Sequence, residues 1–364
     1  MKEIRKKIPL SDDPILHRYF SHAHAFFDIE TTGFSPKNSF VYLIGMAVRR
    51  EDFIEIIQFF AENRTQEAEI LSAFFQSLTS VHTLITFNGD RFDFPFLKAR
   101  EALHGLSNPW EDVSSLDLYK LTGKFAHLFH LPDKKQKSVE KFLGIEREDC
   151  FGGGELISVY YAYEKQKDLQ SEQLLLLHNY EDVLGMTKLL ALLSYADFFD
   201  GPPSVLSAVK ERRRSYEQKN EAYELLLTLR VPAPFPKRIF CQNDLCSLLC
   251  DGSLARLLVK IFCGELRFYY ENYKDYYYLP KEDMAIHKSV AAFVDASHRK
   301  KATAATCYSR KSGRFLPQHT SDITPCFYPG KKSGISYFEM TEEFLSDPAA
   351  LNAYAAGMLK VFKR

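Results

Sequence analysis

Polar and apolar positions in the first half of the chain follow two alternating patterns. Short apolar runs rich in β-branched and aromatic residues predict strands at 25–30, 40–49, 52–60, 83–87 and 112–116. Helix-like spacing of apolar residues separates these runs and is longest from Glu172 to Tyr195, where leucines can line one face. This interleaving predicts an α/β architecture, with a mixed central sheet flanked by helices.

The long helical pattern must end near Asp200-Gly201-Pro202-Pro203, because glycine and proline do not continue a helix. A chain of 364 residues is long enough for about two domains. We therefore predict an N-terminal extension at 1–24, an α/β domain at 25–200 and a second domain at 204–364 that is a candidate for nucleic-acid binding.

The second domain is predicted to be α+β, first helical and then β-rich. Apolar spacing favours helices at about 204–229 and 243–263, with the strand-like segment VPAPF between them. The segments ELRFYYENYKDYYYLP and KATAATCYSRKSGRFLPQ each contain two strand-like runs around a polar turn. This pattern predicts two hairpins.

Two carboxylates lie inside the first predicted strand. Asp28 and Glu30 are two residues apart among Phe26, Phe27 and Ile29, so on a strand both point to the same face. Two ionised carboxylates side by side in apolar surroundings are costly unless a proton or a divalent cation neutralises them. The pair is therefore a candidate metal site.

Two more carboxylates occupy positions where they can join this pair. Asp93 follows the strand at 83–87 and the turn that begins at Asn88, in the first turn of a predicted helix. Asp182 lies on the long helix four residues after His178, which places imidazole and carboxylate on one side of the helix. Both could address the same water molecule.

These segments resemble the DEDD family of ribonuclease-H-like 3′-to-5′ exonucleases. DIETTG matches the first motif of that family, Asn88 through Asp93 (N-x-x-x-F-D) the second, and His178 through Asp182 the third. The third motif departs from the family, in which a tyrosine stands four residues, or a histidine five residues, before the last aspartate. Here histidine takes the tyrosine position, and Tyr180 is on the wrong side of the helix. Overall the chain is most similar to the bacterial YprB-type subgroup.

The resemblance implies hydrolysis of phosphodiesters with two divalent cations about 3.5–4 Å apart. Asp28 would bridge both cations, Glu30 and Asp182 would hold the cation on the nucleophile side, and Asp93 would act on the other. Oxygen ligands without cysteine favour Mg²⁺ or Mn²⁺. His178 is the candidate for orienting or deprotonating the water, although a helix-surface or core histidine is the alternative.

The same resemblance places the terminal nucleotide of a substrate beside the end of the first strand. Thr31, Thr32 and Gly33 follow the paired acids, and glycine permits close approach of a backbone. Asn88 and Phe92 could touch sugar or base by analogy with the family.

Neighbouring residues have alternative interpretations. Asp90 is better placed to cap a helix than to bind metal, and Asp117 to cap a helix or support the site than to ligate. The phenylalanines are more often core than platforms for base stacking; they are Phe92, Phe94 and Phe96. The run Gly152–Gly154 could approach a phosphate or simply make a turn.

Composition bears on the cellular location. The chain has no run of 18 apolar residues and no apolar segment after its basic start, which argues against a membrane span and an ordinary signal peptide. Seven cysteines without a CxxC pair suggest a reducing, cytoplasmic environment. Cys241, Cys246 and Cys250 fall on a predicted helix, where buried thiols are favoured over a metal site.

The net charge of zero conceals an asymmetry. Residues 1–200 hold 22 Lys and Arg against 30 Asp and Glu, whereas residues 201–364 hold 25 against 17. The basic second half could contact phosphates, or be an ordinary solvated surface. Arg212, Arg213 and Arg214 are interpreted as a solvated helix face. Tyrosines beside Arg267 and Lys274 could stack on unpaired bases or pack a sheet; they are Tyr269, Tyr270, Tyr273, Tyr276, Tyr277 and Tyr278.

The leading hypothesis is a metal-dependent 3′-to-5′ exonuclease that acts on single-stranded or frayed ends of DNA or RNA and releases nucleoside 5′-monophosphates. One alternative is a structure-specific endonuclease that uses the same site. Another is a catalytically weak nucleic-acid-binding scaffold that works with a helicase, a partner for which the sequence carries no signal. The sequence does not distinguish DNA from RNA or define an oligomeric state.

Overall fold

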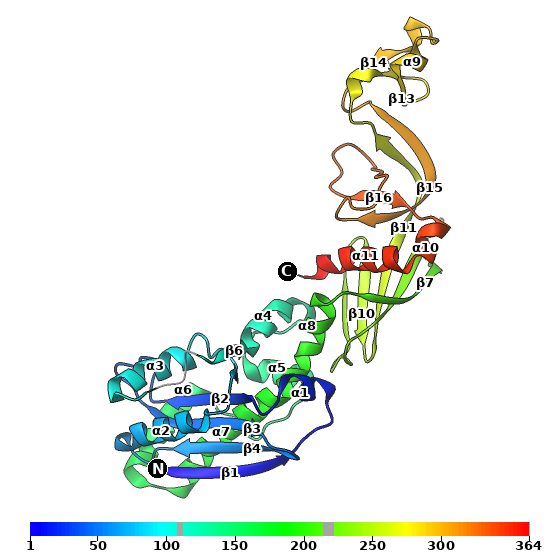
Figure 1. The fold of residues 1–364 in the computed structure, drawn as a ribbon. Coiled ribbons are helices and arrows are strands. Elements are labelled where there is room, and N and C mark those ends of the chain that lie inside the picture. The colour runs from blue at the N-terminus through cyan, green and yellow to red at the C-terminus, as the bar shows by residue number, and fades with distance from the viewer. Residues whose placement is uncertain (108–111, 214–221, 364) are drawn as a thin grey trace. The chain divides into compact units, whose positions relative to one another are not determined.

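The computed structural model describes residues 1–107, 112–213 and 222–363. The chain separates into two compact units (Figure 1). The first comprises Met1–Asp197 and Phe235–Lys237, and the second comprises Phe198–Pro234 and the chain from Arg238 onward.

A six-stranded mixed sheet forms the centre of the first unit, in the order β1-β4-β3-β2-β5-β6. β1 to β4 pair antiparallel, and β2, β5 and β6 run parallel, which confirms the predicted mixed sheet. The strands are β1 Lys2–Pro9, β2 His24–Thr31, β3 Val41–Arg49, β4 Phe53–Phe60, β5 Thr83–Thr86 and β6 Ser114–Asp117. Part of the segment 1–24, predicted as an extension, is therefore an edge strand of this sheet.

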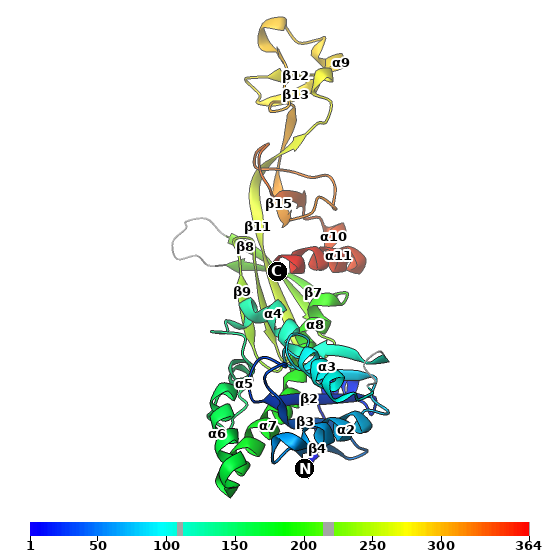
Figure 2. The same cartoon turned by 90° about the vertical axis from the view of Figure 1, so that its left-hand side faces the viewer.

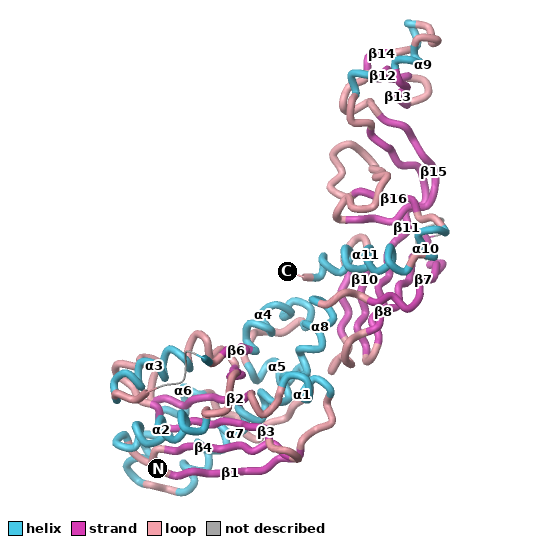
Figure 3. Tube along the Cα trace, viewed as in Figure 1, coloured by secondary structure: helices cyan, strands magenta, loops and turns pink. Residues whose placement is uncertain are grey.

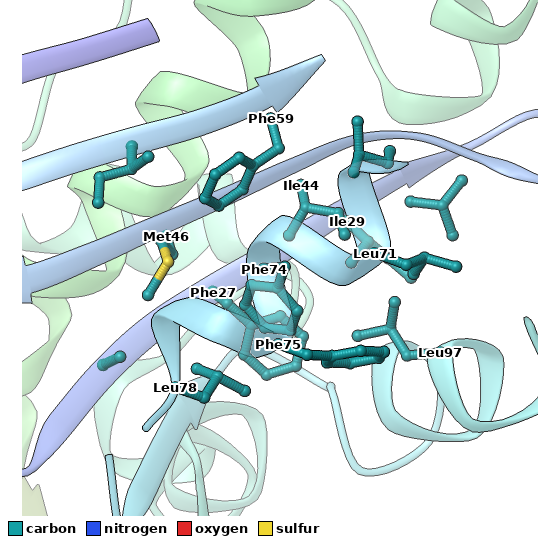
Figure 4. Packing of buried hydrophobic residues seen from close by; sticks show 14 of the residues in the cluster. Phe27, Ile29, Ile44, Met46, Phe59, Leu71, Phe74, Phe75, Leu78 and Leu97 are labelled. Carbon is teal, nitrogen blue, oxygen red and sulfur yellow. The ribbon is translucent and has the colours of Figure 1, made fainter. Parts of the chain in front are cut away.

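Helices cover both faces of the sheet (Figure 2). The first core lies between the strands and the pair α2 and α3, where Phe27 and Ile29 of β2 meet Phe74 of α2 (Figure 4). The second core places Tyr42 and Phe60 against Tyr160 of α6 and Leu175 of α7. The helices are α1 Pro14–Tyr19, α2 Glu67–Ser77, α3 Asp93–His104, α4 Leu118–Phe129, α5 Gln136–Leu143, α6 Gly153–Gln166, α7 Leu169–Leu189 and α8 Leu193–Asp200.

The second unit consists mainly of strands (Figure 3). Its described residues form a seven-stranded sheet, in which β8 and β15 both pair with the long strand β11, and a three-stranded sheet of order β13-β12-β14. The strands are β7 Ser204–Arg213, β8 Ala222–Arg230, β9 Ile239–Gln242, β10 Cys246–Asp251, β11 Leu254–Tyr269, β12 Tyr276–Leu279, β13 Met284–His287, β14 Lys300–Lys301, β15 Tyr308–Gln318 and β16 Ser336–Glu339. The helices are α9 Lys288–Ala291, α10 Glu342–Ser346 and α11 Pro348–Leu359.

The helices predicted at 204–229 and 243–263 are wrong. Their described residues form strands and the turns between them, and β11 buries Ala255, Leu257, Val259 and Ile261 at every second position. A period of two is typical of a strand, whereas the prediction rested on an apolar spacing that was interpreted as helical. The VPAPF segment, predicted as strand-like, is irregular.

Three further predictions for this unit, which concern the hairpins, the cysteines and the arginine run, are also corrected by the structure. The two predicted hairpins do not form, because β11 pairs with β15, and β12 pairs with β13 and β14. The cysteine cluster lies on β9 and β10, and Arg212 lies on β7, so neither is on a helix. Arg213 is the last residue of β7, and Arg214 lies outside the described residues.

All seven cysteines are free thiols. Within the described ranges, no helix combines the length and the apolar character needed to cross a membrane.

Candidate functional site

Three elements that are far apart in the sequence bring the predicted acids together in the first unit. Asp28 and Glu30 come from β2, Asp93 from the start of α3, and His178 and Asp182 from α7. All five line one pocket of about 590 Å³. Strand alternation explains part of this arrangement, because the residues between the core-facing side chains of β2 point to the opposite face of the sheet.

Asp28 is held by an amide of α7. Asn179 Nδ2 donates to Asp28 Oδ2 (3.2 Å) and to its backbone oxygen (3.3 Å). Gln58 Nε2 in turn donates to Asn179 Oδ1 (3.0 Å), which fixes the orientation of the amide. Asp28 pairs with Gly45 of β3, where a Cβ atom would lie 2.1 Å from Asn179 Oδ1. Glycine at this position therefore lets α7 approach the sheet closely enough to reach Asp28.

Asp93 joins the start of α3 to β2. Its Oδ1 accepts a hydrogen bond from the backbone N–H of Ile29 (3.1 Å), and the side chain is buried. The preceding turn passes through Asn88 in a left-handed conformation (φ 69°). Asp117 Oδ1 accepts from the N–H of Asn88 (2.8 Å) and also caps α4 at Tyr119 (2.9 Å). The prediction that Asp117 caps a helix is confirmed.

His178 stands between carboxylates on both sides of its ring. Its Nδ1 lies 2.6 Å from Asp149 Oδ2, and its Nε2 lies 3.2 Å from Asp182 Oδ2 and 3.6 Å from Glu30 Oε1. A neutral ring that donates from Nδ1 to Asp149 presents the lone pair of Nε2 to the pocket. Nε2 is therefore the ring atom that faces Glu30 and Asp182 in the pocket.

Basic side chains offset the acids on the side of α5. Arg147 Nη2 donates to Asp182 Oδ1, and Arg147 Nε lies 2.5 Å from Glu140 Oε2. Lys137 Nζ lies 2.8 Å from Asp149 Oδ2. As a result, one oxygen of Asp182 is engaged by the guanidinium, and the other faces His178.

The pocket carboxyls hold their protons more strongly than usual. Burial raises the pKa of Asp28 and Glu30 well above the ordinary range, and the neighbouring Asp182 and Asp93 raise both further. Burial also raises the pKa of Asp93 to about 7, against the opposing hydrogen bond from Ile29. These carboxyls therefore share a region that favours added positive charge.

Asp149 shows the opposite behaviour. Burial acts to raise its pKa, but hydrogen bonds from Lys137, from the N–H of Phe151 and from His178 together lower it. Asp149 is therefore ionised and can hold a hydrogen on His178 Nδ1.

The donor set fits divalent cations. Glu30, His178 and Asp182 each offer one ligand atom, and these atoms lie within 4.8 Å of one another. The carboxylate oxygens suit hard cations such as Mg²⁺ or Mn²⁺, whereas imidazole is a donor that other transition metals prefer. The carboxylates are therefore the donors for a hard cation in this group, and His178 lies beside them.

The predicted substrate contacts divide into two groups. Thr31, Gly33, Asn88 and Phe92 line the same pocket as the acids. Thr32 is buried, and its hydroxyl oxygen accepts a hydrogen bond from the N–H of Phe40 (3.1 Å). Thr32 therefore supports the loop and does not face the pocket.

An exposed aromatic ring at the pocket was missed by the sequence interpretation. Phe34 lines the pocket with 81% of its surface exposed, and its ring meets Phe92 edge to face at 6.3 Å. Phe94 is partly buried and Phe96 lies in the core, in agreement with the interpretation of these phenylalanines as core residues. The sequence signal that could have identified Phe34 is an aromatic residue placed directly after DIETTG, next to Gly33.

Two other neighbours of the motifs have structural roles. The prediction that Asp90 caps α3 is wrong. Asp90 instead accepts hydrogen bonds from Ser115 Oγ (2.5 Å) and from Lys120. Gly152 is the N-cap of α6, and Gly153 and Gly154 line the pocket. Asp149 and Arg147, which contact His178 and Asp182, lie just before this glycine run and were not identified from the sequence.

The sheet order, the two covered faces and the position of the pocket define the ribonuclease-H-like fold for the first unit. Residues 25–194 match the family model described as the RNase_H superfamily. No curated protein matches the chain.

Several solved structures are similar to the chain. The family B DNA polymerase from the hyperthermophilic archaeon Pyrobaculum calidifontis shares 12% identity with a TM-score of 0.37, over 67% of this chain and 33% of that one. E. coli ExoI in a complex with single-stranded DNA shares 14% identity with a TM-score of 0.29, over 58% of this chain and 55% of that one. A further exonuclease I structure shares 12% identity with a TM-score of 0.28, over 57% and 55%. The chain thus spans between a third and just over half of the length of these proteins.

Proposed function

We propose that the chain is a metal-dependent 3′-to-5′ exonuclease of the DEDD type, similar to the YprB subgroup. It would hydrolyse phosphodiester bonds at single-stranded or frayed ends and release nucleoside 5′-monophosphates. The observation that carries the proposal is the convergence of Asp28, Glu30, Asp93 and Asp182 in one pocket beside His178. The superfamily match over residues 25–194 supports it.

The raised pKa values of three of these acids explain why the pocket would take up cations. Asp28 would hold both divalent cations, Glu30 and Asp182 the one on the nucleophile side, and Asp93 the other. Cations bound there would polarise the phosphate and lower the pKa of the attacking water.

His178 would take the proton of that water at Nε2. The ring is held for this task by Asp149 at Nδ1, which leaves Nε2 directed toward Glu30 and Asp182. Arg147 forms an ion pair with one oxygen of Asp182 and so fixes the orientation of its carboxylate. These contacts position the acceptor before substrate enters.

The rim of the pocket would bind the terminal nucleotide. Phe34 and Phe92 present rings on which an unpaired base can stack, and the backbone at Thr31 and Gly33 lies beside the acids. The 3′ polarity of attack rests on the resemblance of the three motifs to the DEDD family.

The test is degradation of 5′-labelled single-stranded DNA and RNA with Mg²⁺, with Mn²⁺ and with EDTA. Wild type should give a ladder that shortens from the 3′ end, only with a divalent cation. Asp28→Asn should lower the rate by about 10³-fold or more, because buried charge aimed at the reacting groups is removed. The matched control is Asp90→Asn, an acid of the second motif segment that pairs with Lys120 outside the pocket; its rate should stay within about twofold of wild type.

Other results would favour the alternatives. Cutting of 3′-blocked substrates at internal sites would indicate a structure-specific endonuclease with the same acids. Binding without turnover under either cation would indicate a nucleic-acid-binding scaffold, and a helicase would then be the partner to test.

A further inference from the structure

A second pocket, of about 1030 Å³, lies entirely within the second unit. Its walls come from the end of β11, from β12 and β13, and from the loop that precedes β16. Pockets of 300–1,000 Å³ are typical of small-molecule sites, so this one has room for one or more nucleotide-sized groups.

Stacked tyrosines form one wall. The rings of Tyr270 and Tyr276 lie 4.5 Å apart with an interplanar angle of 14°, and His287 meets Tyr276 edge-on at 5.5 Å. Tyr270 follows the last residue of β11, its N–H donates to the backbone oxygen of Cys307 (3.0 Å), and it lines the pocket. Unpaired bases stack on rings presented in this way.

These tyrosines also pack against a small apolar cluster, but they are only partly buried by it. Tyr270 and Tyr276 pack against a small cluster of Ala285, Ala302 and Cys307, yet both rings remain only partly buried. Both tyrosines line the pocket, and Phe268 meets the Tyr270 ring edge to face at 5.4 Å. The wall is therefore preformed and still accessible.

Positive charge accompanies the aromatic wall. Lys331 lines the pocket with its Nζ 4.7 Å from the centre of the Tyr269 ring, and the guanidinium of Arg267 lies 4.5 Å from that of Tyr308. Residues 260–332 contain 13 Lys and Arg against 7 Asp and Glu. This segment thus carries most of the positive excess of the second half of the chain.

Two carboxylates also line the pocket, and both are compatible with the binding of unpaired bases. Asp275 pairs with Lys288 at 2.7 Å, so its charge is offset. Glu271 is exposed and can accept hydrogen bonds from the amino groups of bases.

We infer that this tyrosine-walled pocket binds unpaired nucleotides of single-stranded nucleic acid. The inference rests on the proposed function for the class of ligand, but it concerns binding and needs neither the acids of the first unit nor a divalent cation. Tyr270 and Tyr276 supply the stacking surface, and Lys331 supplies a phosphate contact.

The test measures binding of the full-length chain in EDTA by fluorescence anisotropy, with labelled 15-nucleotide oligothymidylate and a duplex of the same length. Tyr270→Ala should weaken single-strand binding roughly 5- to 150-fold, as expected for loss of one base–aromatic stack. Tyr270→Phe keeps the ring and should bind within about twofold of wild type. Tyr273→Ala is a matched control, because that tyrosine is 38% exposed on the same segment but does not line the pocket.

Lys331→Gln provides a second variant at an exposed residue, where folding is not at risk. It should reduce the slope of log K against log salt for the single strand by about 0.7, the value for one phosphate contact. Circular dichroism of each variant separates loss of binding from loss of fold.

Binding that is unchanged in folded Tyr270→Ala and in Lys331→Gln would overturn the inference, even if the chain degrades nucleic acid. Equal loss of single-strand binding with Tyr270→Phe would also overturn it, because stacking would not be the cause. Tyr270-dependent binding in a chain that shows no hydrolysis would sustain the inference while the proposed function failed.

Discussion

Burial acts to raise the pKa of each acid around His178, but the partners of these acids differ. Asp28 and Glu30 are buried and also face other carboxylates, so the pKa of each is raised. Asp149 receives hydrogen bonds from Lys137, Phe151 and His178 that outweigh its burial, so its pKa is lowered. The first group is therefore suited to binding cations, and Asp149 is suited to holding a ring in place.

The raised pKa of Asp93 predicts that the free energy of unfolding, measured in EDTA, depends on pH. A carboxyl whose pKa rises from 3.8 to about 7 on folding binds its proton more tightly in the folded chain. Stability should then fall as pH increases through this window, by up to about 1.4 kcal/mol per pH unit. The free energy of unfolding of wild type, minus that of Asp93→Asn, should therefore decrease from pH 4 to pH 7.

Divalent cations should counter this loss. Mn²⁺ competes with protons for the same oxygens, so the rise in melting temperature that it causes should be larger at pH 7 than at pH 5. Thermal unfolding with MnCl₂ and with EDTA at each pH measures this. A rise that is independent of pH, or unchanged in Asp93→Asn, would contradict the assignment of Asp93 to the cation site.

Asp149→Asn should impair the chemical step more than substrate binding. The amide can still reach Nδ1 but no longer holds a hydrogen there as an ionised carboxylate does, so the ring loses its fixed orientation. We expect kcat to fall by roughly 10- to 100-fold with KM within about threefold, measured on single-stranded substrate. Glu148→Gln, at the exposed neighbouring position, is the control. A change confined to KM would exclude a positioning role.

At the scale of elements, the close approach of α7 to the sheet assembles the site. The side of α7 that faces β2 and β3 carries Asn179 and Val183 as well as His178 and Asp182. Gly45 makes room for it, since a Cβ there would also lie 2.9 Å from Val183 Cγ2. Gly185 of α7 has a similar role. A Cβ atom there would lie 1.9 Å from Glu140 Oε1, so glycine leaves room for the ion pair of Glu140 with Arg147 against α7.

Gly45→Ala should therefore disturb both stability and the site. The added methyl group must displace Asn179, which costs about 1–3 kcal/mol in a packed core and breaks the hydrogen bond to Asp28. Chemical denaturation should show this loss, and activity should fall with it. Gly123→Ala in α4 is the matched control, because its nearest neighbour would be Lys134 Nζ at 3.8 Å. Equal stability of the two variants would show that α7 can shift without cost.

At the scale of the whole molecule, charge is divided between the two halves. Residues 1–200 carry an excess of acids and residues 201–364 an excess of bases, with a net charge of zero overall. Acids that await cations repel a polyanion when they are ionised. Under the proposed function, the basic second half would therefore attract the nucleic acid.

This division predicts which lysines govern the salt dependence of binding. Changing both Lys300 and Lys301 to Gln should lower the slope of log K against log salt for single strands by about 1.4 in EDTA, if each contacts one phosphate. The paired change of Lys165 and Lys188 to Gln removes the same charge from the acidic half and should leave the slope unaltered. Equal slopes for both double variants would indicate that net charge alone matters.

The sequence by itself determined the features that depend on local order. Short apolar runs rich in β-branched and aromatic residues predicted the strands of the first unit, and helical spacing predicted α7, because both signals depend on a few neighbouring residues. The spacing of Asp28 with Glu30 and of His178 with Asp182 likewise fixed which pairs share a face. These local relations were sufficient to expect the mixed sheet and a cluster of acids.

Only the tertiary structure decided what meets across long sequence separations. The contacts of Asp149 with His178, of Arg147 with Asp182 and of Asn179 with Asp28 join elements whose approach no local pattern encodes. The same is true of the pairing of β11 with β15, whose partners lie 39 to 53 residues apart and which replaced the two predicted hairpins. Leucine-rich β8 and β11 were misread as helices because their burial is settled by neighbouring strands, and strand pairing is a non-local choice.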